Sequence, residues 1–126
     1  MKLANQIFLA LLLCLVGISS NAQAQDSAVS DLVSALRGEV QRCWAPPMLT
    51  GKRPRPAVIS VRLNRDGSLD GTPVLANRSS NENFKVMANS AIRAIERCAP
   101  FESVRQNHVP YDKWRQLKLR FVAPEF

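Results

Sequence analysis

Few side chains in this sequence have the type and spacing that catalysis or metal binding requires. The single histidine, His108, lies in a polar stretch with no cysteine or histidine at ligand spacing, so we interpret it as a solvated loop residue. No serine stands in a nucleophile elbow, and there is no glycine-rich phosphate loop. The segment 64–70 is rich in oxygen ligands but lacks the downstream glutamate of a calcium loop. We therefore predict that the protein is not an enzyme and needs no cofactor.

The best candidate for a ligand-binding patch is a short basic loop. Its three cations, Lys52, Arg53 and Arg55, are interrupted by Pro54, which restricts the backbone. Such a loop could present a fixed set of positive charges to phosphate or carboxylate groups. An ordinary solvated loop is the alternative interpretation of the same run.

The N-terminus predicts export. Lys2 supplies a positive charge, and the apolar run that follows, Ile7 to Ile18, is shorter than the roughly 20 residues needed to span a bilayer. Ala22-Gln23-Ala24 then matches the small-x-small pattern of signal peptidase sites. We expect cleavage after Ala24, which divides the chain into a signal peptide (1–24) and one periplasmic domain (25–126). Retention of the signal as a weak tether is the minor alternative.

The chain is basic, with 17 Lys and Arg against 10 Asp and Glu and a net charge of +7. In an exported protein this balance argues against nucleic acid as the working partner. It favours acidic protein surfaces or anionic components of the cell envelope. Charge that merely keeps a small domain in solution explains the balance equally well.

Two cysteines remain once Cys14 leaves with the signal peptide. In an oxidising compartment Cys43 and Cys98 should pair, and the ligands that would complete a metal site around them are missing. The chain-entropy model assigns a loop of this length about 4 kcal/mol of stabilisation. We therefore predict a structural disulfide.

Apolar residues repeat at helical spacing in the first part of the domain. Asp26 or Ser27 can cap this predicted helix, and Pro46-Pro47 must follow its end. Its apolar stripe consists of Val29, Leu32, Val33, Leu36, Val40 and Cys43.

A second predicted helix repeats the pattern. Ser79 and Glu82 have the spacing of a capping box, and Pro100 ends the helix. Its apolar stripe consists of Phe84, Met87, Ala88, Ala91, Ile95 and Cys98. Because both stripes end on a cysteine, we expect two helices that lie on one sheet and are joined at their ends.

Three segments favour β-strands. Residues 57–63 alternate and lead into Asp66-Gly67, a strong hairpin signal, and a weaker strand follows at about 71–77. Pro73 places that strand at a sheet edge. After a loop at 99–110, residues 114–122 form the last strand. The predicted fold is α+β, a three-stranded antiparallel sheet with both helices on one face, in the order α-β-β-α-β.

Four segments carry a resemblance to a known group: Arg42–Pro47 with its double proline, Val61–Leu69, Ala91–Phe101, and Tyr111–Trp114. Together they resemble the C-terminal domain of TolA, within the TonB/TolA C-terminal superfamily, over about residues 32–125. Unlike TolA and TonB, this chain is expected to carry neither an uncleaved anchor nor a long spacer. It looks like the partner-binding C-terminal domain of that family as a stand-alone secreted domain.

The resemblance implies a domain without catalytic chemistry that receives other envelope proteins. In that family an extended peptide adds to the edge of the last strand. Carried over, the docking edge would consist of Arg115, Gln116, Leu117, Lys118, Leu119 and Arg120. The cations among them would favour an acidic peptide, or they could simply guard the edge against aggregation.

We therefore expect a periplasmic adaptor that docks periplasmic or outer-membrane proteins by strand addition, with a Tol–Pal system, a TonB system or neither. The alternative is a basic protein whose surface recognises anionic groups of peptidoglycan or lipopolysaccharide. Self-association through the same open edge also remains an alternative, and no permanent membrane span is expected.

Overall fold

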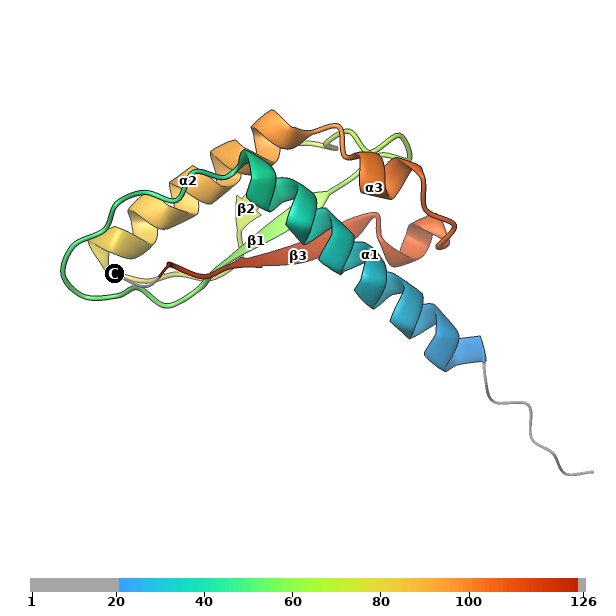
Figure 1. Cartoon of the computed structure of the whole chain (residues 1–126), viewed down its shortest axis with the longest axis horizontal. Coiled ribbons are helices and arrows are strands. Elements are labelled where there is room, and N and C mark those ends of the chain that lie inside the picture. Colours follow the sequence, from blue (N-terminus) through green and yellow to red (C-terminus); the bar gives the residue numbers. More distant parts are fainter. Residues whose placement is uncertain (1–20, 125–126) are drawn as a thin grey trace, which may run out of the picture.

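The computed structural model describes residues 21–124 (Figure 1). Its first element is α1, Asn21–Cys43. The helix therefore passes through Asp26 and Ser27, and the prediction that either of them caps it is wrong. Alanine and glutamine are good helix formers, so Ala22 to Gln25 extend the helix upstream. The apolar run of the expected signal peptide lies outside the described residues, and within them no helix is long and apolar enough to cross a bilayer.

The sheet has three antiparallel strands in the order β2-β1-β3, and this confirms the predicted fold class. The central strand is β1, Ala57–Arg62, and β3, Gln116–Phe121, pairs with it along its whole length. The short β2, Val74–Leu75, pairs with the other side of β1. The prediction that β2 is an edge strand is confirmed.

The extent of β2 was overestimated, since only two residues of the predicted 71–77 form a strand. Beyond the end of β2, the side chain of Asn77 forms hydrogen bonds with the backbone at the start of β1. Its Oδ1 accepts a hydrogen bond from the Val58 amide at 2.9 Å, and its Nδ2 donates to the Pro56 carbonyl at 2.9 Å. The Asn77 side chain thus pairs the backbone groups at the start of β1, so a longer β2 is not needed to pair them.

The second long helix, α2, spans Glu82–Cys98. Its cap is Asn81, whose side chain accepts from the Phe84 amide at 3.3 Å, and not Ser79 as predicted. Ser79 instead accepts from the Asn81 amide at 3.1 Å and so supports the capping residue. The end of the helix before Pro100 is confirmed.

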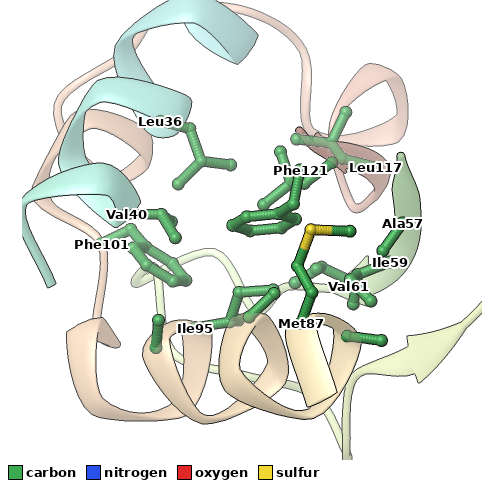
Figure 2. Close-up of a cluster of buried hydrophobic side chains, with 14 of the residues drawn as sticks. Leu36, Val40, Ala57, Ile59, Val61, Met87, Ile95, Phe101, Leu117 and Phe121 are labelled. Carbon is green, nitrogen blue, oxygen red and sulfur yellow. The ribbon is translucent and has the colours of Figure 1, made fainter. Parts of the chain in front are cut away.

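One core joins the helices to one face of the sheet. Figure 2 shows α1 and α2 directing Leu36, Val40, Met87 and Ile95 toward the side chains of the sheet. The sheet contributes cross-strand pairs on this face: Ala57 with Phe121, Ile59 with Leu119, and Val61 with Leu117. The alternate residues of β3, Gln116, Lys118 and Arg120, are exposed on the opposite face of the sheet.

The predicted disulfide between Cys43 and Cys98 is confirmed, with its Cα atoms 5.8 Å apart. It joins the last residue of α1 to the last residue of α2. Beyond it, the predicted loop 99–110 contains a further short helix, α3, Glu102–Arg105, and a 3-10 turn, Tyr111–Lys113, precedes β3.

Glu39 of α1 fastens α3 to the domain. Its carboxylate accepts from the Glu102 amide at 2.8 Å, and from the Ser103 amide and hydroxyl at 3.1 and 2.6 Å. Partial burial raises the pKa of Glu39, but the hydrogen bonds from Ser103 and Glu102, together with the charge of Arg42, outweigh it. The pKa therefore lies below the ordinary 4.5.

A pH-dependent stability effect is expected from Glu39→Gln. A depressed carboxyl pKa stabilises the fold above the pKa of the unfolded chain, and this contribution is lost as the pH falls through the folded pKa. The variant should be about 1 kcal/mol less stable than the native protein at neutral pH. The difference should shrink as the pH falls below 4.5.

Urea denaturation between pH 7 and pH 3 measures this difference. Glu96→Gln is the matched control, because Glu96 is exposed on α2. A deficit of Glu39→Gln that is the same at every pH would contradict the assignment.

Candidate functional site

The free edge of β3 is the first feature of the candidate site. The Leu63 amide donates to the Arg115 carbonyl at 2.8 Å, which sets the alternation of the β1–β3 ladder. By that alternation, residues 117, 119 and 121 direct their backbone groups to β1. Gln116, Lys118 and Arg120 direct theirs away from it. Within residues 21–124 no strand pairs with this second edge of β3.

A groove lies beside this edge, between α1 and β3. We call it the α1–β3 groove; its volume is about 240 Å³. It is lined by Arg37, Val40, Gln41, Trp44, Leu119, Arg120, Phe121 and Val122. Arg37, Val40 and Gln41 lie on one face of α1, and Trp44 follows the end of that helix. The other four residues are consecutive and run from Leu119 in β3 to Val122 just after it.

Trp44 is held in place at the groove. Its indole Nε1 donates to the Ser90 hydroxyl at 3.0 Å. Its ring meets Phe121 edge to face, with ring centroids 5.2 Å apart. Two aromatic rings, one directly after α1 and one in β3, thus form a rigid apolar wall.

The residues predicted to form the docking edge lie on β3 or just before it. Gln116, Lys118 and Arg120 are exposed, whereas Leu117 and Leu119 are core residues that face the helices. Arg115 precedes the strand and is exposed. Four of the six predicted residues can therefore reach a partner with their side chains.

The basic loop lines a hollow, and two of its three cations already bond to other parts of the domain. A hollow of about 540 Å³ is lined by Lys52, Arg53, Pro54, Arg55, Ser79, Ser80 and Asn81. Arg53 donates to the Ala123 carbonyl at 2.8 Å, and Arg55 donates to the Arg78 carbonyl and lies 5.8 Å over the Phe84 ring. Both arginines therefore hold the loop against the domain.

The remaining candidate residues lie apart from the β3 edge. His108 is exposed in the segment before the 3-10 turn. In the loop after β1, Asp66 accepts from the Ser68 amide and hydroxyl at 3.0 and 2.6 Å, and these bonds lower its pKa. The carboxylate of Asp66 therefore stabilises the turn after β1. Among residues 21–124 no three His, Cys, Asp or Glu side chains gather in a way that could hold a metal ion.

The α1–β3 groove was missed by the sequence reasoning. Val40 was placed in the apolar stripe, but Arg37, Gln41 and Trp44 received no role. The available signal was the tryptophan directly after Cys43, because the disulfide fixes the end of α1 and so limits where Trp44 can lie.

Comparison with known proteins corrects the expected family. A family model described as uncharacterised conserved protein UCP034077 matches residues 22–107, and no TolA or TonB C-terminal family matches. No curated protein and no solved structure matches the chain.

The resemblance to TolA was therefore wrong as an assignment of family. A cysteine pair, a double proline after a helix and an Asp-Gly turn are devices that any small disulfide-closed α-β-β-α-β domain can use. Strand docking at β3 consequently depends on the geometry alone, and β3 lies beyond the matched residues. Since the match covers well over half of the sequence, the chain belongs to the family described as uncharacterised conserved protein UCP034077.

Proposed function

We propose that this domain is a non-catalytic binding module that takes up an extended segment of another protein by strand addition to β3. The observation that carries the proposal is the edge of β3 with which no strand of residues 21–124 pairs, together with the α1–β3 groove beside it. Main-chain hydrogen bonds to Gln116, Lys118 and Arg120 would supply affinity, and the groove would supply selectivity.

The charges on β3 favour a different protein over a second copy of this chain. If two β3 edges paired antiparallel about Lys118, that residue would stand opposite its own copy. Like charges directly opposite each other destabilise a strand pair. Lys118 and Arg120 therefore guard against self-pairing while leaving the edge open to neutral or acidic segments.

We further propose that the protein is exported and works in the periplasm, on the strength of its N-terminal sequence. Partners would then be periplasmic or outer-membrane proteins. Intact mass spectrometry of the protein from native cells should find Gln25 as the first residue. Finding Met1 or Lys2 would contradict cleavage.

Proline scanning of β3 tests strand addition directly. The Lys118 amide points away from β1, so Lys118→Pro removes a docking donor and leaves the β1–β3 ladder whole. Lys118→Ala is the matched control because it removes the same side chain but keeps the amide. Crosslinked capture from envelope extracts should give a discrete partner with the native protein and Lys118→Ala, and none with Lys118→Pro. Circular dichroism checks that each variant folds.

A second candidate function is supported by the hollow at the basic loop. Lys52, Arg53 and Arg55 surround it, and anionic groups of peptidoglycan or lipopolysaccharide suit such a surface. Binding of this kind should collapse with added salt, because exposed charges are screened beyond about 8 Å at physiological ionic strength. If Lys118→Pro captures the same material as the native protein, and salt removes it, the basic hollow is the working site.

A further inference from the structure

We propose that the segment accepted by β3 alternates acidic and apolar residues, with an apolar side chain seated in the α1–β3 groove. This inference rests on the strand addition proposed above. It goes further by defining the sequence class of the partner, which follows from the two different environments on either side of the β3 edge.

The alternation follows from the register of a paired strand. Cross-strand neighbours place their side chains on the same face of the sheet. A partner residue opposite Leu119 or Phe121 would point to the helix side, toward the α1–β3 groove. A partner residue opposite Lys118 or Arg120 would point to the open side, beside a cation. Successive partner residues therefore meet the groove and the cations in turn.

The groove suits an apolar side chain. Val40, Trp44 and Phe121 form its apolar part, and the hydrogen bond from Trp44 to Ser90 fixes the indole before any partner arrives. Its volume of about 240 Å³ is several times the roughly 30 Å³ that one water molecule occupies in the liquid, so a branched aliphatic side chain has room. A wall that is already rigid loses little entropy on binding.

The charges at the edge suit carboxylates. Lys118 and Arg120 are exposed on β3, and Arg37 and Arg120 line the groove, whose lining includes no carboxylate. The ion pairs formed within residues 21–124 involve other cations, namely Arg62, Lys85 and Arg105. The positive charge at the edge is thus left available, and an acidic segment complements it.

Short fluorescent peptides of equal length test this specificity. The first alternates Glu and Val, the second alternates Lys and Val, and the third alternates Glu and Ser. We expect the Glu/Val peptide to bind the purified protein about tenfold more tightly than the Lys/Val peptide, since each cross-strand charge pair contributes modestly. The Glu/Ser peptide should also bind more weakly, because it leaves the groove unfilled.

Charge exchange then shows where the preference resides. Lys118→Glu combined with Arg120→Glu should reverse the order of the Glu/Val and Lys/Val peptides. Arg93→Glu combined with Arg97→Glu changes the net charge equally on the exposed face of α2 and should leave the order unchanged.

The outcomes separate this inference from the proposed function. If all three peptides bind with equal affinity and Lys118→Pro abolishes binding of each, strand addition stands and the acidic–apolar specificity is overturned. If the β3 and α2 charge variants weaken binding of the Glu/Val peptide equally, the preference reflects net charge alone. That result would also overturn the proposed acidic–apolar specificity. If no peptide binds the native protein, both proposals fail.

Discussion

Replacing both Cys43 and Cys98 by alanine should lower the free energy of unfolding by about 4 kcal/mol. The bridge joins residues 55 positions apart and ties the end of α1 to the end of α2. Without it the unfolded chain gains the entropy of an open loop, and the covalent link between the two helix ends is lost. The free energy of unfolding of a small domain is only about 5–15 kcal/mol, so the variant would be left with much less stability than the native protein.

Guanidinium titrations of the native protein with and without dithiothreitol measure the effect of the disulfide. The double alanine variant is the control, since reductant should not change its unfolding midpoint. A reduced native protein as stable as the oxidised form would show that the disulfide contributes nothing to the fold.

The next largest loss is expected from Gly67→Ala in the loop after β1. Gly67 has φ +86°, and an added Cβ would collide with the backbone of Phe101, whose nitrogen would lie 3.0 Å away. The Gly67 carbonyl also accepts from the Phe101 amide at 2.9 Å, so this loop is packed directly against the start of α3. Strain and collision together should cost about 3 kcal/mol.

Gly71→Ala separates the two contributions. Gly71 has nearly the same conformation, φ +85°, but nothing lies within 4 Å of an added Cβ. Gly71→Ala should lower the free energy of unfolding by only the cost of a positive φ at alanine, about 1 kcal/mol. Thermal or urea denaturation of both variants would reveal the difference, and equal losses would contradict the close packing of Gly67 on Phe101.

The parts of the fold that depend on long periodic patterns could be predicted from the sequence. Both helical stripes end on a cysteine, and the alternation of Leu117, Leu119 and Phe121 identifies the buried face of β3. These patterns are strong because each element buries one whole face. The disulfide followed from the number of cysteines.

The details that escaped prediction depend on contacts between distant segments. The cap of α2 is Asn81 because its side chain reaches the Phe84 amide, although the spacing of Ser79 and Glu82 fits a capping box. Likewise, β2 is short because Asn77 bonds to β1, and α3 is held by Glu39. Local sequence does not specify any of these partners.

The candidate site was predictable only in part for the same reason. The last strand was identified as a docking edge through a resemblance that did not hold, but the exposed backbone of Lys118 and Arg120 supports the same edge on geometric grounds. The α1–β3 groove lies where the C-terminal end of α1 meets the last residues of β3, and the spacing of residues within either element does not reveal that contact.

Amide hydrogen exchange on β3 tests strand addition most directly. In the free protein the amides of Leu117, Leu119 and Phe121 should exchange slowly, because they pair with β1, while those of Lys118 and Arg120 exchange fast. With the Glu/Val peptide or a captured partner at saturation, the Lys118 and Arg120 amides should become protected. If they still exchange fast when the partner is fully bound, the partner does not add a strand to β3.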